Sequence, residues 1–198
     1  MELFDKEELF DTVKLKTICE IRTGYQGKKE EGNMYKLINP TDLSNDGLIS
    51  LENTKTFGEK EINPKFILKK QEILFKAKSS YNAVTVFKGN NQNLVPSVHF
   101  FILNIKDKLK KEINPEYISW YLGEEKAQKH FKKLATGMAM PIVRKSDLED
   151  LEVNIPSIEV QDKVAQVQQL FLKEKQLLEE LIFIKEKQIK SILSKLAN

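Results

Sequence analysis

At 198 residues, with 40% hydrophobic and 31% charged residues, the chain has the composition of a globular protein with one domain and, at most, an appendage. Its single cysteine excludes an internal disulfide, and one cysteine with two histidines cannot form any familiar zinc site. The acidic start lacks the basic and apolar regions of a signal peptide, and no apolar run reaches the roughly 18 residues of a membrane span, so we expect a cytoplasmic protein that contacts no membrane.

Residues 1–155 are expected to form one mixed α/β body built around a curved sheet. Short β-branched and aromatic runs alternate there with Gly, Asn and Pro. A helix capped by Asn114 is predicted to run to residue 134 with a break at Gly123, and a shorter helix with capping-box spacing is predicted at 146–149. The predicted strands are 13–21, 35–38, 66–68, 73–77, 83–87 and 98–103.

Residues 157–196 contain neither Gly nor Pro and predict one long helix. Its apolar residues recur at alternating steps of four and three, which is the period of a coiled coil. A helix of this length would span about 60 Å, more than one small domain can cover. We therefore expect 156–198 to be an association helix, and a helix folded back onto its own body is the alternative. The residues expected at its interface are Val164, Phe171, Leu178, Ile182, Ile189 and Ile192.

Basic residues are concentrated in the middle of the chain. Residues 60–145 hold 17 Lys or Arg against 7 Asp or Glu, a local net charge of +10, although the whole chain carries only +3. A surface of one sign is what phosphate binding requires, and the Asn and Gln of neighbouring loops could pair with bases. Lysine-rich chains also carry excess lysine on ordinary surfaces, so charge alone leaves both interpretations open.

Known catalytic motifs are absent from the sequence. Residues 24–29, Gly-Tyr-Gln-Gly-Lys-Lys, are faintly similar to a phosphate loop but lack its Gly-x4-Gly-Lys-Ser/Thr spacing. No nucleophile elbow or dinucleotide fingerprint occurs either. Cys19 lies in an apolar run and is expected to be a buried core thiol. The sequence thus favours a binding protein with no catalytic residue, metal or cofactor.

The junction between the body and the long helix carries the most specific pattern. It contains Thr136-Gly137, then Ser146-Asp-Leu148, then Ile155-Pro156, and an early Glu-x-Gln at 159–161. In this order the motifs resemble the specificity subunits of type I restriction–modification systems, in which a target-recognition domain runs into a spacer helix. Further pieces similar to that family are Val13-Lys-Leu15, Thr23-Gly-Tyr25, Glu72-Ile-Leu-Phe75, Pro96-Ser-Val-His-Phe100 and Tyr117-Ile-Ser-Trp-Tyr-Leu122.

The resemblance implies an α+β target-recognition domain at 1–155 and a spacer and dimerisation helix at 156–198. It implies a prokaryotic, non-catalytic subunit that reads half of a bipartite double-stranded DNA target and docks methyltransferase subunits. Methylation and cleavage would belong to those partners and to a restriction motor subunit. A typical specificity subunit has two recognition domains and two spacer helices, whereas this chain has one of each. It would be either a natural half subunit or a piece of a longer chain, and we expect a second copy to pair with it. An assembly adaptor that does not read DNA, or an enzyme with an unfamiliar site, is the rival function.

Two groups of loop residues are predicted to contact DNA. The first group would anchor phosphates, and the second would read bases through amide or aromatic groups. The predicted phosphate contacts are Lys28, Lys29, Lys78, Lys88, Arg144 and Lys145. The predicted base contacts are Tyr25, Gln26, Tyr81, Asn82, Asn91, Gln92 and Asn93.

Overall fold

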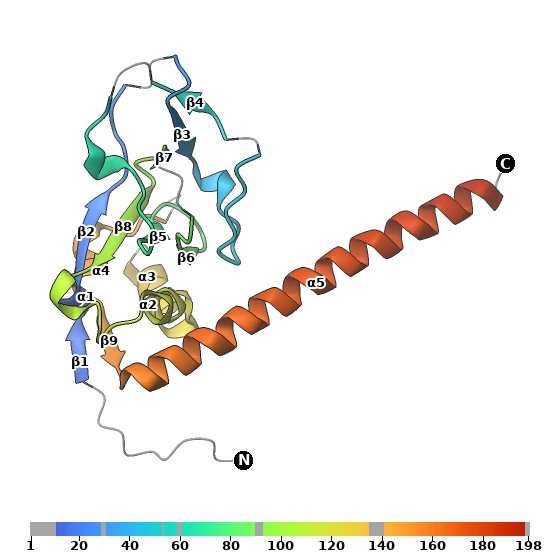
Figure 1. Cartoon of the computed structure of the whole chain (residues 1–198). Coiled ribbons are helices and arrows are strands. Elements are labelled where there is room, and N and C mark those ends of the chain that lie inside the picture. The colour runs from blue at the N-terminus through green and yellow to red at the C-terminus, as the bar shows by residue number, and fades with distance from the viewer. Residues whose placement is uncertain are drawn as a thin grey trace, which may run out of the picture.

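A computed structural model of the chain describes residues 11–28, 31–52, 54–58, 61–89, 93–134 and 141–196. The strands in these ranges form three sheets, and a long helix projects from the body that the sheets and shorter helices build (Figure 1). The expected α+β body with one long C-terminal helix is therefore confirmed.

The largest sheet has four antiparallel strands and lies at the centre of the body. Its middle is buried on both faces: Ile73 and Phe75 pack into one cluster with the helices, whereas Leu74, between them, packs into a second cluster with Phe100. This alternation follows from the two-residue period of a strand, and it explains the continuous apolar run in the sequence. In spatial order the strands are β2 (Cys19–Thr23), β8 (Phe100–Ile105), β5 (Ile73–Lys76) and β6 (Val84–Val86).

Two smaller sheets complete the body. One consists of β4 (Thr56–Phe57), β3 (Tyr35–Ile38) and β7 (Leu94–Pro96), with β3 and β7 parallel. The other pairs β1 (Asp11–Lys14) with β9 (Glu152–Ile155) in antiparallel register. The β1–β9 pair places the first described residues beside the segment that leads into the long helix.

The predicted helix at Asn114 is confirmed, and so is its break at Gly123. Helix α2 (Pro115–Gly123) begins after Asn114, whose side chain accepts a hydrogen bond from the Glu116 amide at 2.8 Å. Helix α3 (Glu125–Leu134) follows directly and buries Phe131 edge-on against Phe75 of the central sheet.

Two predicted strands are wrong. The expected strand 13–21 is interrupted by α1 (Leu15–Ile18), because Leu15 and Ile18 bury one helical face where the chain passes from the β1–β9 pair to the central sheet. The expected strand 66–68 begins instead as a 3-10 helix (Pro64–Phe66), in which the Asn63 side chain caps the Lys65 amide at 3.0 Å. In both places tertiary contacts or a local cap outweigh strand propensity.

The short helix near 146 is confirmed, but its expected capping box is displaced. Helix α4 (Lys145–Glu149) starts one residue earlier than the motif suggested. The Asp147 carboxylate accepts a hydrogen bond from the Arg144 amide at 3.0 Å, so Asp147 satisfies the exposed donor at this helix start.

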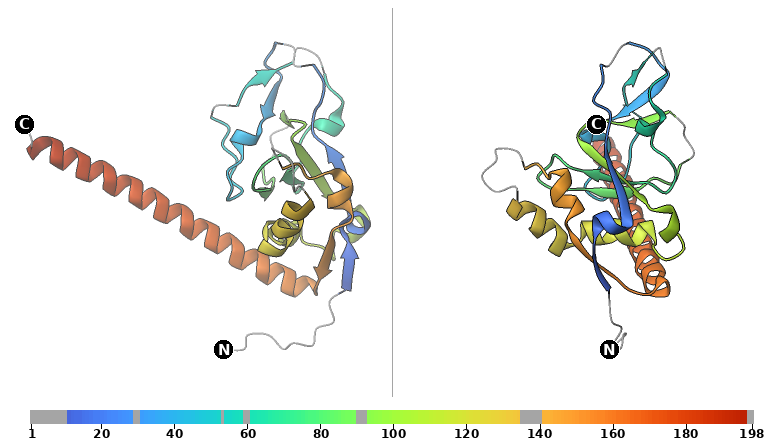
Figure 2. Two further views of the ribbon diagram at one scale, coloured as in Figure 1. Left: turned by 180° about the vertical axis from the view of Figure 1, so that it is seen from behind. Right: turned by 90° about the vertical axis from the view of Figure 1, so that its left-hand side faces the viewer.

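The long helix α5 (Ile158–Leu196) has 39 residues, in agreement with the sequence. Its start is fixed by buried Gln161, whose side chain bonds to the Asn114 amide and to the carbonyls of Glu112 and Pro156, each at 2.9 Å. One further contact to the body is the Lys175–Asp46 ion pair at 2.5 Å. Beyond it α5 runs away from the body, as the left-hand view of Figure 2 also shows. No helix in the described ranges combines the length and hydropathy of a membrane span.

Cys19 is buried, as predicted, with 3% of its surface exposed. Burial raises the pKa of its thiol to about 12. The thiolate is the reactive form, so we expect a disulfide reagent at pH 8 to label native protein far more slowly than protein unfolded in denaturant. Equal labelling rates in the two conditions would contradict the buried position.

Candidate nucleic-acid interface

Three segments with predicted DNA-contacting residues meet at one end of the central sheet. Strands β2 and β5 both pair antiparallel with β8, so they run in the same direction and finish level, with Thr23 opposite Phe101 and Lys76 opposite Phe100. The segment before α4 joins them because the Val143 amide donates to the Ala77 carbonyl at 2.9 Å. We call this region the sheet end.

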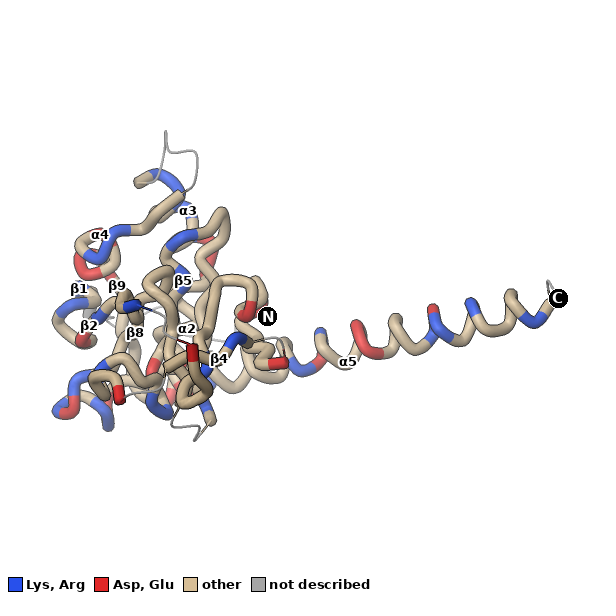
Figure 3. The backbone as a smooth tube through the Cα atoms, turned by 90° about the horizontal axis from the view of Figure 1, so that it is seen from above, with Lys and Arg blue, Asp and Glu red and all other residues tan. Residues whose placement is uncertain are grey.

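Besides Tyr25, five of the predicted side chains lie on the three segments that meet at the sheet end. Lys28, Arg144 and Lys145 are exposed, as is Gln26, while Lys78 is half-buried and bridges to Ile142. Figure 3 shows the basic residues at α4 on this part of the tube. Residues from loops 24–28, 76–78 and 141–145 are thus brought together, although they are far apart in the sequence.

A concave surface lies in the sheet end and is named here the β2-edge pocket. It has a volume of about 350 Å³. Two predicted residues, Gln26 and Lys145, contribute to it, together with Lys65 and Arg22, which the sequence interpretation did not single out. Its full lining is Ile21, Arg22, Thr23, Gly24, Gln26, Lys65, Phe66 and Lys145.

Arg22 and Glu72 form a partly buried ion pair behind this pocket. The guanidinium contacts both carboxylate oxygens, at 2.7 and 2.6 Å, and its Nε donates to the Lys65 carbonyl at 2.6 Å. Glu72 also accepts from the Lys69 amide at 2.8 Å. A bidentate pair with additional backbone bonds has a fixed geometry, so segment 65–69 is held against β2.

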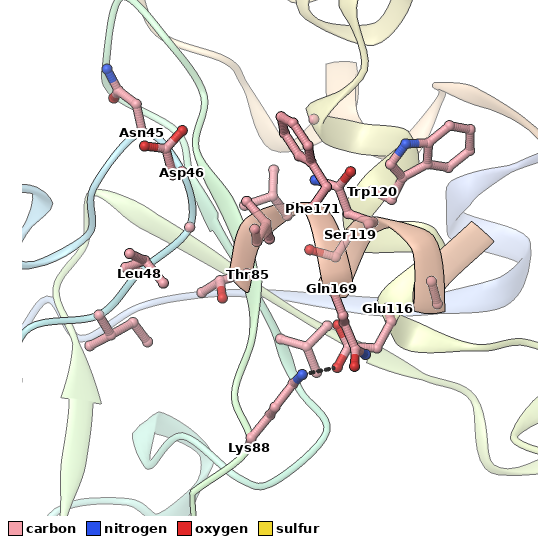
Figure 4. Close-up of a pocket in the computed structure, with 18 of the residues that line it drawn as sticks. Asn45, Asp46, Leu48, Thr85, Lys88, Glu116, Ser119, Trp120, Gln169 and Phe171 are labelled. Atoms are coloured by element: carbon pink, nitrogen blue, oxygen red, sulfur yellow. Dashed lines mark ion pairs between the residues drawn. The ribbon is translucent and has the colours of Figure 1, made fainter. Parts of the chain in front are cut away.

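Tyr81 and Lys88 lie away from the β2-edge pocket: Tyr81 is in the turn between β5 and β6, and Lys88 follows β6. Both line a larger groove of about 690 Å³ between loop 45–51, β6, α2 and α5, named here the α5 groove (Figure 4). Lys88 forms an ion pair with Glu116 there at 2.9 Å. Burial first, and then the Asp46 carboxylate, raises the pKa of the Tyr81 hydroxyl. Since β2 and β6 are opposite edges of the central sheet, these residues form a separate site.

Three residues that were predicted to contact bases, Tyr25, Asn82 and Asn93, are partly or fully buried in the structure. The Tyr25 ring packs on Phe57 and Phe66, with centroids 5.3 Å away in each case, and its hydroxyl donates to the Lys28 carbonyl. Asn82 is only 6% exposed and its amide donates to the Lys76 carbonyl at 2.8 Å, which leaves it no surface for a base. We therefore reassign Asn82 to packing. Asn93 is half-buried.

Lys29, Asn91 and Gln92 lie outside the described residues. Along α5, five of the six predicted interface residues are exposed: Phe171, Leu178, Ile182, Ile189 and Ile192. Val164 differs, because it packs in part against the core of its own body.

Comparisons with known proteins agree with this architecture. A family model described as "Type I restriction modification DNA specificity domain" matches residues 7–182. The solved type I restriction–modification S subunit from M. genitalium is similar, with a TM-score of 0.62 and 19% identity, over 94% of this chain and 45% of that one. The HsdS subunit from Thermoanaerobacter tengcongensis is similar with a TM-score of 0.58 and 14% identity, over 88% of this chain and 40% of that one.

A further structure, solved to explain complex assembly and conformational transition of the type I R-M system, is similar with a TM-score of 0.65 and 14% identity, over 96% of this chain and 45% of that one. The chain thus spans less than half the length of each of these solved chains. No curated protein matches it. The family match covers most of the sequence, and the chain belongs to the type I restriction–modification DNA specificity domain family.

Proposed function

We propose that this chain is a non-catalytic DNA-specificity subunit that reads one half of a bipartite double-stranded target and pairs with a second copy of itself. Family membership supports the reading of DNA. The observation that carries the pairing is the apolar surface of α5, which the body leaves uncovered beyond the first turns.

That surface is too apolar to be a solvated face. Leu178 is 53% exposed and Ile182 58% exposed, and apolar side chains continue as far as Leu196. Contiguous exposed apolar surface on a protein marks an interaction site. A closed twofold contact is the commonest way for identical chains to cover such a surface.

The charges of α5 support an antiparallel arrangement. Its first part, 158–172, carries two carboxylates and one lysine, whereas its last part, 185–196, carries four lysines and one glutamate. Antiparallel pairing places the acidic part of one helix beside the basic part of the other. Parallel pairing would place like charges together, which is unfavourable. The two bodies would then lie at opposite ends of the helix pair, and the target would be palindromic.

A second row of exposed apolar residues remains available for other partners. It consists of Leu170, Leu177, Leu181 and Ile184. We assign this row to the methyltransferase subunits, which in turn would recruit the restriction motor subunit. Catalysis would belong to these partners, and the compartment would be the prokaryotic cytoplasm.

At the sheet end, we expect the double variant Lys28→Gln/Arg144→Gln to bind DNA with a weaker salt dependence. Each lost phosphate contact lowers the slope of log K against log salt by about 0.9, so the double variant should lose about 1.8. The measurement is a binding titration at several salt concentrations with duplex DNA.

The matched control is Lys108→Gln/Lys111→Gln, which removes two exposed lysines just beyond the opposite end of β8. Equal salt slopes for the two double variants would remove the DNA contacts from the sheet end. If the unmodified chain, alone and with methyltransferase subunits, binds no DNA while still forming a complex, the adaptor function replaces this proposal.

A further inference from the structure

We propose that the β2-edge pocket binds one phosphate of the DNA backbone, with Lys65 as its cation and Arg22 as the residue that positions Lys65. The inference rests on the proposed function and assigns to that function a site outside the residues chosen from the sequence. It also gives a role to the glycine-containing loop that begins at Gly24.

The lining of the pocket has the chemistry of an anion site. Arg22, Lys65 and Lys145 contribute three cations, and Gln26 contributes an amide that can donate. No carboxylate is among the described residues that line it. A phosphate would therefore meet donors without a competing negative charge inside the pocket.

Lys65 is the cation with the greatest freedom to bind a ligand. Arg22 is paired with Glu72, and Lys145 with Glu149 at 3.3 Å. Lys65 takes part in none of the ion pairs found among the described residues. Its ammonium lies 5.0 Å from the centre of the Phe66 ring, at the wall of the pocket. Lys65 thus carries the charge that a phosphate would neutralise.

The backbone of Lys65 is held from both sides. Its carbonyl accepts from Arg22 Nε at 2.6 Å, and its amide donates to the Asn63 side chain at 3.0 Å. The neighbouring Phe66 ring packs edge-on against Tyr25. A cation whose main chain is fixed in this way loses less conformational entropy on binding than one on a free loop.

The opposite wall is equally constrained. Gly24 donates to the Phe100 carbonyl at 3.0 Å and approaches Ser97 and Pro96 so closely that any Cβ would collide with their carbonyls. Loop residue Gln26 is thereby held beside the pocket. The volume is at the lower limit for ligand sites, and major-groove reading requires a helix or a two-stranded ribbon. Its size therefore suits an anchor for the backbone better than a reader of bases.

The test compares Lys65→Gln with Lys65→Arg and with the control Lys108→Gln, an exposed lysine beyond the far end of β8. DNA affinity is measured between 50 and 200 mM salt. Lys65→Gln should lower the salt slope by about 0.9. The ratio of the unmodified chain's affinity to the variant's affinity should therefore fall about 3.5-fold between the lowest and the highest salt concentration. Lys65→Arg should keep the slope, and Lys108→Gln should leave it unchanged.

Arg22→Lys tests the positioning role. It keeps the charge but loses the bidentate pair and the bond to the Lys65 carbonyl. We expect the same loss of slope as in Lys65→Gln, with circular dichroism and thermal unfolding used to confirm that the variant is folded. A folded Arg22→Lys variant with the slope of the unmodified chain would remove Arg22 from the inference.

A second readout does not depend on DNA. Titration of the isotope-labelled chain with inorganic phosphate should shift the amide resonances of Gly24 and Gln26, and Lys65→Gln should abolish those shifts. If DNA binds but Lys65→Gln behaves like Lys108→Gln in both readouts, the pocket is not a phosphate site and the proposed function stands. If phosphate shifts these amides and DNA does not bind, the site stands and the proposed function fails.

Discussion

Replacing both Leu178 and Ile182 with Asp is expected to convert the chain from a dimer into a monomer. The two residues lie near the middle of α5, where the twofold axis of an antiparallel pair would cross, and both are more than half exposed in the single chain. In the dimer the new carboxylates would be buried without partners. A single buried charge left without a partner costs about 3–5 kcal/mol, so the dissociation constant should rise at least about 100-fold.

Sedimentation equilibrium at micromolar concentration measures this change, and circular dichroism checks that the helix persists. The matched control is Gln169→Asp/Ser191→Asp. Each control position is nine residues, or about two and a half turns, from Leu178 or Ile182, and so lies on the opposite face of α5. It adds the same two charges and should remain dimeric. An unmodified chain that sediments as a monomer at this concentration, with no methyltransferase present, would refute the pairing.

Gly24→Ala is expected to destabilise the body by roughly 3 kcal/mol or more. A Cβ at this position would lie 2.6 Å from the Pro96 carbonyl oxygen and closer still to that of Ser97, inside the 3.0 Å that real Cβ atoms keep. The atoms that this Cβ would meet belong to the backbone, so they cannot move aside as the end of a flexible side chain can. Overpacking typically costs about 1–3 kcal/mol, and here the segment that follows β2 must also move away from β7. In a chain of this size the melting temperature should fall by roughly 6–12 °C.

The control for this substitution is Gly123→Ala at the end of α2, where an added Cβ meets nothing within 4 Å. Alanine is the better helix former, so this variant should melt at the same temperature or slightly above it. Scanning calorimetry on both variants provides the measurement. Equal melting temperatures for Gly24→Ala and the unmodified chain would show that the backbone around Gly24 is less constrained than its contacts indicate.

Local patterns in the sequence predicted those elements whose cause is local. The 157–196 segment has a helical period and no helix breaker, and α5 follows it closely. Asn114 before Pro115 predicted the start of α2 because a cap acts within three residues. By contrast, α1 arises because residues 15–18 cross between two sheets, and no local signal distinguishes that crossing from a continued strand.

The candidate site could be predicted only in part, for a related reason. The segments that carry Lys28 and Arg144 meet at the sheet end because of strand pairing and the Val143–Ala77 hydrogen bond, which no run of charges reveals. Lys88 carries the same charge but follows β6, the opposite edge strand, and binds Glu116. Arg22 and Glu72 are fifty residues apart, so their pair, which constrains Lys65, becomes visible only once the sheet is assembled.

The Lys175–Asp46 ion pair gives α5 the mechanics of a lever. Gln161 is the pivot, since it is buried and bonded to three backbone groups of the body. Lys175 is 14 residues further along, about 21 Å from the pivot, and Leu196 is 35 residues along, about 52 Å from it. A displacement of 1 Å at Asp46 would therefore move the distal end of the rod by about 2.5 Å.

The angle of this lever depends on the packing of Val164 and Ala165 against the body and, further along the helix, on one partly exposed ion pair, in which Lys175 and Asp46 retain 40% and 39% of their side-chain surface. Such contacts contribute about 0–1 kcal/mol and are weakened by salt. In the proposed antiparallel pair, the far end of each rod would lie beside the other chain's body. Small rotations at loop 45–51 would thus change the distance between the two recognition bodies. The spacing between DNA half-sites that the pair tolerates would then depend on this loop as much as on the number of helical turns.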